Sequence, residues 1–189
     1  ALNLFSYVDN PFTPEAKFDF AKFREHVGKA MHMMDDIIDL ELEKVEQIIE
    51  KIAADPEDED VRHVELELWK KIRTMARKGR RTGLGITAEG DMLAALGLRY
   101  GSQEAIDFAV EVQKTLAVEA YRASVKMAAE RGAFPIYDAA KEKSNPMIAR
   151  IREADPALYE EMCRVGRRNI AMLTIAPTGT TSLMSQTTS

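Results

Sequence analysis

The chain has 189 residues, of which 46% are hydrophobic and 30% charged, and it carries a net charge of −5. These values suit one globular domain with its own core, and the negative charge argues against a general nucleic-acid binder. No apolar run approaches the ~20 residues that span a bilayer, and a single cysteine, Cys163, excludes an internal disulfide. We therefore expect a cytoplasmic protein without nucleic-acid or membrane partners.

Two long helices are predicted in the N-terminal half. Residues 1–8 suggest a short strand, and Asn10-Pro11 a turn. From about Asp19 to Ile52 apolar residues recur every three to four positions, which predicts a long helix. A second helix is expected from about Asp60 to Lys78, with Gly79 as its stop. Its predicted buried stripe consists of Val61, Val64, Leu68, Ile72 and Met75.

The acidic run 55–60 between these helices is interpreted as a solvated loop. The segment of about 40–78 is compatible with a helical hairpin inserted into the fold.

Shorter elements follow in alternation. A glycine-containing strand is expected over Thr82–Thr87, a short helix over 90–98, and a long helix from the N-cap Ser102 to Arg131. The inward residues predicted for this long helix are Ile106, Ala109, Leu116, Ala120 and Met127.

Two short helices are expected after Asn145-Pro146 and Asp155-Pro156, followed by a strand over Ile170–Ala176 that is covered on both faces. Strands that alternate with helices predict a helix-rich α/β fold with parallel pairing.

The strongest candidate site follows the last strand. Pro177 ends the strand because proline has no N–H for a ladder. Backbone N–H groups and hydroxyls in a small-residue loop can converge on a phosphate. The predicted phosphate-binding residues are Pro177, Thr178, Gly179, Thr180, Thr181 and Ser182, with a helix beginning near Ser182. The same residues also suit an ordinary turn, and this alternative stays open.

Three sequence blocks, in order, resemble one protein family. They are Ala1-Leu2-Asn3-Leu4 with Phe18-Asp19-Phe20 and residues 34–39; residues 79–87 with 90–97 and 100–102; and residues 167–169 with 176–182 and 187–189. Together they resemble the large, catalytic subunit of ribonucleotide reductase, closest to its adenosylcobalamin-dependent class II branch. The resemblance extends over essentially the whole chain.

This resemblance implies a partial segment of a ten-stranded α/β barrel, with residues 1–189 as an internal piece of the catalytic domain that holds about three strands. The loop 177–182 would cradle the phosphates of a ribonucleotide substrate. The resemblance also implies adenosylcobalamin in the parent enzyme, with none bound by this segment alone. The partners expected are the substrate and the rest of the reductase chain, and a homo-oligomer is compatible with exposed barrel edges.

The radical chemistry of the family needs several cysteines, and this chain has only Cys163. We expect Cys163 in the last turns of a helix as a partly buried small side chain. No catalytic residue is therefore assigned, and the chain alone is predicted to be inactive. The alternative is a non-catalytic, helix-rich interaction module derived from the same family.

Other polar residues are given structural interpretations. His32 with Asp35, Asp36 and Asp39 forms a faint metal-ligand pattern, but a solvated helix face explains it better, and no metal ligand is assigned. The basic clusters 77–81 and 164–168 follow predicted helices, where cations favour the negative end of the dipole.

Overall fold

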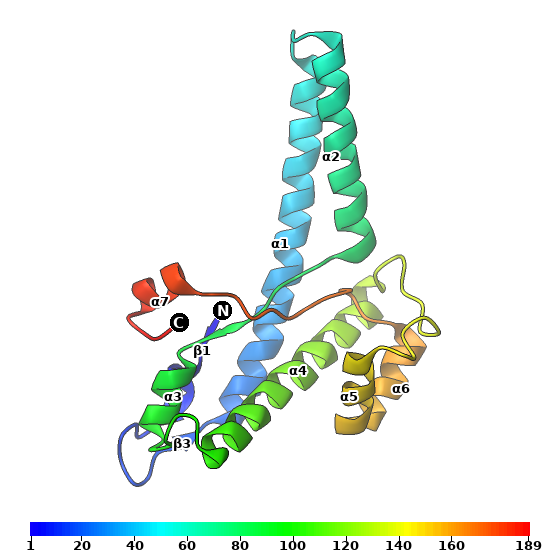
Figure 1. Ribbon diagram of the computed structural model, residues 1–189. Helices are drawn as coiled ribbons and strands as arrows, with labels where there is room; N and C mark the ends of the chain where they lie inside the picture. The colour runs from blue at the N-terminus through cyan, green and yellow to red at the C-terminus, as the bar shows by residue number, and fades with distance from the viewer.

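The computed structural model describes residues 1–189 and is built mainly from helices (Figure 1). In chain order these are η1 (Leu4–Tyr7), α1 (Phe20–Ala54), α2 (Glu59–Gly79), α3 (Glu89–Ala95), α4 (Gln103–Arg131), α5 (Pro146–Ala154), α6 (Pro156–Val165) and α7 (Gly179–Ser185). The strands are two residues each: β1 (Leu2–Asn3), β2 (Val8–Asp9), β3 (Lys17–Phe18) and β4 (Ile86–Thr87). None of the helices combines the length and the apolar character needed to cross a bilayer.

The helix boundaries follow local capping chemistry, as the sequence predicts. Side chains at six N-caps accept a hydrogen bond from a first-turn N–H, namely those of Asn3, Asp19, Asp58, Ser102, Asn145 and Asp155. Gly132 and Gly166 end α4 and α6 at positive φ angles of 87° and 80°. The helices expected over 19–52, 60–78, 102–131 and after residues 145 and 155 are confirmed, with small shifts at their ends.

Three extended segments lie side by side and run parallel. Leu2 pairs with Ile86 in the β1–β4 ladder, and Leu84 forms an isolated parallel bridge with Leu173. Parallel pairing is thus confirmed, but the regular strands are much shorter than expected. Residues 1–8 form a strand, a 3₁₀ turn and a second short strand instead of one strand, and β2 pairs antiparallel with β3.

The segment 170–176 differs from its prediction as a doubly covered strand. Only its first half is packed, because Met172 is buried while Ile175 is 80% exposed. Its hydrogen bonds go to one neighbour: the carbonyls of Ala171 and Met172 accept from the N–H groups of Thr82 and Leu84. The other edge has no neighbouring strand in this chain, and the three parallel segments form no closed barrel.

The core lies where α1 crosses α4. Phe23, Val27 and Met31 of α1 are fully buried, and Val112, Leu116 and Ala120 of α4 are buried in the same cluster. Met127 is buried as expected, whereas Ile106 is exposed, contrary to its predicted inward position. Because α4 carries alanine and small side chains on its inner face, α1 can pack closely against it.

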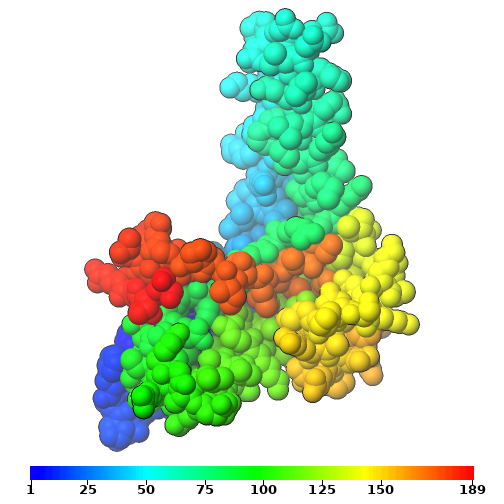
Figure 2. Space-filling model, in the orientation of Figure 1, coloured from blue at the N-terminus to red at the C-terminus, as the bar shows by residue number.

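The second half of α1 and all of α2 form a hairpin that projects from the body (Figures 1 and 2). The predicted inner face of α2 is wrong, because Val61, Val64, Leu68 and Met75 are exposed. Of the predicted stripe only Ile72 is half-buried, and it lies at the border with a second apolar face whose half-buried residues are Leu66, Trp69 and Ala76. The helix carries two apolar stripes, and the stripe that contains Trp69 faces α1.

Substitutions of Met31 and Met33 should distinguish the buried face of α1 from its exposed face. Met31 is 0% exposed and Met33 is 66% exposed, so the pair is chemically matched. Met31→Ala should lower the free energy of unfolding by about 2–5 kcal/mol, because it leaves a cavity between α1 and α4. Met33→Ala should change it by less than about 0.5 kcal/mol. Urea denaturation monitored by circular dichroism measures both, and equal effects would contradict the described core.

Candidate functional site

The predicted phosphate loop lies at the start of α7. The helix begins at Gly179, three residues earlier than expected, so Gly179, Thr180 and Thr181 occupy its first turn. The first intrahelical bond runs from the N–H of Ser182 to the carbonyl of Thr178, at 2.7 Å. The preceding three N–H groups have no intrahelical acceptor, as at every helix N-terminus.

Thr178 sets the direction of this turn. It adopts a left-handed conformation with φ 50°, and its side chain makes no capping hydrogen bond. The hydroxyl of Ser182 instead donates to the carbonyl of Gly179 at 2.8 Å, and the residue is buried. Among the hydroxyl residues predicted for the site, Thr180 and Thr181 are therefore the exposed ones, while Ser182 holds the turn together.

The loop borders a hollow of about 330 Å³ whose opposite wall is the glycine-containing segment. Gly83, Gly85 and Thr174 line this wall, and Thr178 to Thr181 line the other. A Cβ at Gly85 would lie 2.6 Å from the carbonyl oxygen of Thr174, so only glycine allows the two extended segments to approach this closely. At this position the two segments pack backbone against backbone.

Residues at the end of β4 and in α3 anchor the chain just after α7. The Asp91 carboxylate accepts hydrogen bonds from the N–H and the hydroxyl of Thr188, at 2.7 and 3.1 Å. The carbonyl of Thr188 accepts from the hydroxyl of Thr87 at 2.8 Å and from the N–H of Ala88 at 3.0 Å. Four hydrogen bonds thus fix the chain after α7. The sequence gives no signal for this contact, because its partners lie about a hundred positions apart.

At the other end of the 170–174 segment, one buried carboxylate joins four parts of the chain. Asp35 of α1 is fully buried and accepts hydrogen bonds from Arg80 at 2.9 Å, Asn169 at 2.9 Å and Arg168 at 3.1 Å. Asn169 also donates to the carbonyl of Arg80 and accepts from the hydroxyl of Ser124 in α4. We call these five residues the Asp35 network.

The acidic residues weighed as metal ligands come together but are already paired. Carboxylate oxygens of Asp35, Asp36 and Asp39 lie within 4.8 Å of one another. Asp39 pairs with Arg80 at 2.7 Å and Asp36 with Arg131 at 2.7 Å. Guanidinium groups therefore supply the positive charge, and the structural interpretation of Asp35 replaces that of a solvated face.

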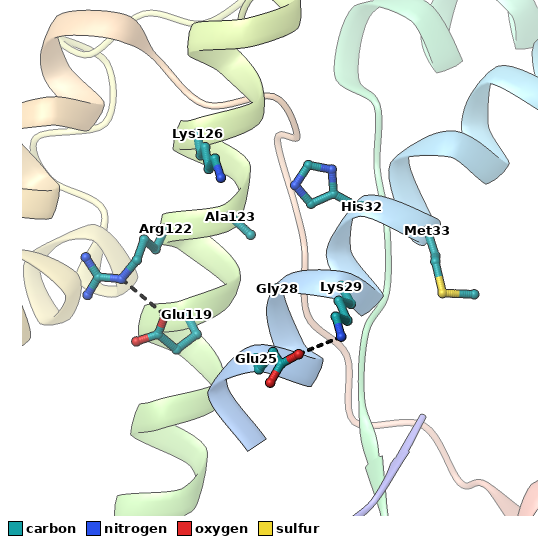
Figure 3. Close-up of a pocket in the computed structure, with 9 residues that line it drawn as sticks. All are labelled: Glu25, Gly28, Lys29, His32, Met33, Glu119, Arg122, Ala123 and Lys126. Atoms are coloured by element: carbon teal, nitrogen blue, oxygen red, sulfur yellow. Dashed lines mark hydrogen bonds and ion pairs between the residues drawn. The ribbon is translucent and has the colours of Figure 1, made fainter. Parts of the chain in front are cut away.

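His32 does not join this cluster. It lines a separate hollow of about 600 Å³ between α1 and α4, beside Lys126 (Figure 3). Gly28 of α1 and Ala123 of α4 leave the space open, and ion pairs Lys29–Glu25 and Arg122–Glu119 border it. Both acids of the lining are already paired and the hollow opens to solvent, so Lys126 and His32 alone define no specific ligand chemistry.

The basic residues before the last extended segment are not simply helix-end charges. Arg167 is 2% exposed, pairs with Glu142, and lies over the rings of Tyr121, Phe134 and Tyr137 at 5.3 to 5.7 Å. Burial raises the pKa of Tyr137 to about 12. Arg167 and Arg80 are thus specific buried groups, which corrects their interpretation as charges that stabilise helix ends.

Cys163 lies near the end of α6, as predicted, but it is exposed and not partly buried. An exposed thiol with no histidine among its described hydrogen-bond or ion-pair partners provides no nucleophile activation.

Comparison with known proteins identifies relatives along the whole chain. A family model described as ribonucleotide reductase, barrel domain, matches residues 1–189. The vitamin B12-dependent ribonucleoside-diphosphate reductase of Thermoplasma acidophilum is 31% identical over 97% of this chain, and that of Mycobacterium tuberculosis is 29% identical over 92%. The ribonucleoside-diphosphate reductase subunit alpha of Chlamydia pneumoniae is 24% identical over 96%. The chain spans 18%, 19% and 16% of the lengths of these relatives, respectively.

Loss of the Asp35 charge should be costly and should change the pH dependence of stability. Asp35→Asn keeps the shape but leaves the half-buried Arg168 without an anion and the buried Arg80 with Asp39 alone, and breaking a buried ion pair typically costs about 3–5 kcal/mol. Burial alone would raise the pKa of Asp35, but hydrogen bonds from Arg80, Asn169 and Arg168 outweigh it and lower the pKa below the ordinary 3.8.

The sign of the pH effect follows from this lowered pKa. The stabilisation by Asp35 is fully present above pH 3.8 and is lost as the pH falls from there through the folded-state pKa. The gap in unfolding free energy between wild type and Asp35→Asn should therefore narrow in acid. Urea titrations from neutral to acid pH measure it. Asp36→Asn, which changes an exposed neighbour, is the control, and a gap that stays constant would contradict the assignment.

Asp91 should control the order of α7. Asp91→Ala removes two of the four hydrogen bonds to Thr188, so the segment 182–188 should open more often. Hydrogen exchange of these amides should become at least about threefold faster, a loss of protection that corresponds to one weak hydrogen bond. Glu89→Ala, at the first residue of α3, the helix that contains Asp91, is the control. Unchanged exchange in Asp91→Ala would show that the anchor does not hold the loop.

Proposed function

The chain belongs to the ribonucleotide reductase barrel-domain family, and we propose that it forms part of the catalytic subunit of a ribonucleoside-diphosphate reductase. In this proposal residues 1–189 are a segment of a longer barrel, and the radical cysteines lie on other parts of the subunit. The contribution of this segment is the loop Pro177–Ser182, which binds the phosphates of the ribonucleotide. The observation that carries the proposal is the hollow between this loop and the glycine-containing segment.

The loop has the chemistry that a phosphate requires. Three N–H groups at the start of α7 point away from the helix without an intrahelical acceptor. Thr180 and Thr181 add hydroxyl donors at the same hollow, and a Cβ at Gly179 would meet nothing within 4 Å, so an anion can approach the backbone. The hollow is of a size that suits part of a small ligand.

The exposed apolar residues around the loop support its place in a larger barrel. Ile175 before it and Leu183 and Met184 after it are 80% to 83% exposed. Large apolar side chains exposed near one loop in this way are typical of a surface that another part of a protein covers. In the proposed subunit, further strands cover the free edge of the 170–176 segment. The projecting hairpin within residues 40–78 would then be an insertion on the outside of the barrel.

Adenosylcobalamin is the proposed cofactor of the complete subunit, because the two more similar relatives are named vitamin B12-dependent. The residues of this chain do not fit that group. The larger hollow is bordered by ion pairs, and the smaller one is lined by glycines and threonines. We therefore assign no residue of this chain to the cofactor and derive no step through it.

The phosphate site is tested by removing one hydroxyl. Thr180→Ala in the complete subunit should weaken ribonucleotide binding by about tenfold, because a hydrogen bond to a charged group contributes about 1.5–3 kcal/mol. Gly179→Val should weaken it further, since a branched side chain would stand in front of the free N–H groups. Calorimetric titration with the nucleotide measures the Kd.

Thr74→Ala is the matched control, because Thr74 is exposed on α2, far from the loop in sequence and outside the hollow. The nucleoside without phosphate provides a second comparison, and its affinity should not change in Thr180→Ala. If the loop variants bind the nucleotide like the wild type, the loop is only a turn and the site assignment is wrong.

A further inference from the structure

The outer stripe of α2 is an apolar surface without a partner in this chain. Val61, Val64, Leu68 and Met75 are between 48% and 67% exposed. Their spacing of three, four and seven positions places them on one face of the helix. The hairpin projects from the body (Figures 1 and 2), and the exposed fractions show that this face of α2 is open to solvent. We call these four residues, with the half-buried Ile72, the α2 stripe.

Charged residues along one edge of the α2 stripe are segregated by sign. Asp60 and Glu67 are seven positions apart, and so are Lys71 and Lys78. All four lie on the same side of the stripe, since positions separated by seven, eleven and eighteen residues share a helix face. The first half of this edge is thus acidic and the second half is basic.

We infer that the α2 stripe binds the α2 stripe of a second copy of this chain, with the two helices antiparallel. In a parallel two-fold pair this charged edge would lie opposite the other edge of the partner's stripe, so the four charges would not meet one another. An antiparallel pair centred near Leu68 places Asp60 of one copy opposite Lys78 of the other, and Glu67 opposite Lys71. Val61 then meets Met75, Val64 meets Ile72, and Leu68 meets its own symmetry mate. The surface is self-complementary, as a two-fold interface requires.

The hairpin is suited to hold this surface in place. On its inner side, Arg73 and Arg77 both pair with Glu46 of α1 at 2.8 Å, so these cations do not compete for the outer edge. Glu67 of the edge pairs with Lys70 of the same helix at 3.2 Å, and an exposed pair of this kind contributes little, so Lys71 of a second copy can share or replace it. At its base, Arg80 is held by Asp35 and Asp39, which fixes the direction of α2 relative to the body. The stripe extends over fourteen positions, or about 21 Å. A single helix pair of this length lies at the small end of specific interfaces, so the association is weak and depends on concentration.

Sedimentation velocity of the complete subunit over a roughly hundredfold concentration range tests the inference, because association follows mass action. The wild type should show an association step that Leu68→Glu weakens by at least about tenfold, since it places two carboxylates at the symmetry axis. Val110→Glu, which adds the same charge at an exposed valine of α4, should leave the step unchanged. Circular dichroism confirms that both variants remain folded.

Two charge variants make the orientation testable. Asp60→Lys with Glu67→Lys makes the edge all basic, and Lys71→Glu with Lys78→Glu makes it all acidic. Each should lose self-association, whereas an equimolar mixture should associate. Absence of the step in the wild type, or self-association of either variant at wild-type strength, would overturn the inference. If the wild type shows no association step but Leu68→Glu lowers the stability of the subunit, another part of the subunit covers the stripe. That result would also overturn the inference.

Discussion

The buried carboxylate of Asp35 is the constraint on which the rest of this structure depends. A buried charge is costly unless it is paired and hydrogen-bonded, and here three side chains from distant parts of the sequence satisfy it. Arg80 brings the end of α2, Arg168 and Asn169 bring the last extended segment, and Ser124 adds α4. Because each of these groups would be unsatisfied if it moved alone, the network fixes the last extended segment relative to α1, α4 and the end of α2.

The network also sets the geometry of the candidate site, although it lies at the opposite end of the same segment. Once Arg80 and Asn169 are held together, the residues that follow each of them run parallel, and Leu84 comes level with Leu173. Because Gly83 and Gly85 have no Cβ atom, their segment can then approach Thr174 closely. The chain therefore leaves the body at Ala176 in a fixed direction, which places the α7 turn beside the hollow.

The sequence was sufficient where the determining interactions are local. N-caps such as Asn145 and Asp155 and glycine stops such as Gly132 define helix ends within one turn, and those predictions are confirmed. Prediction failed where the burial of a residue depends on which distant element packs against it. On α2 the stripe from Val61 to Met75 is more regular, but Trp69 on the other stripe offers more apolar area, and α1 packs there. Likewise, nothing local distinguishes a buried Arg167 from a solvated arginine, because Glu142 and three aromatic rings come from other elements.

The segment 170–176 is packed in its first half and exposed in its second half. The first half therefore contributes to stability, and the second half is available for binding. Arg168 and Asn169, just before the segment, belong to the Asp35 network and Met172 belongs to the core, so this end of the segment shares the stability of the whole domain. Beyond Thr174 the chain has no further ladder partner, and α7 is held mainly by Thr87, Ala88 and Asp91 at its far end. A loop tethered at both ends and open on one edge can adjust to an anion without disturbing the core. In the proposed subunit, the strands that cover Ile175 would complete the hollow, so that substrate binding and barrel closure stabilise the same few residues.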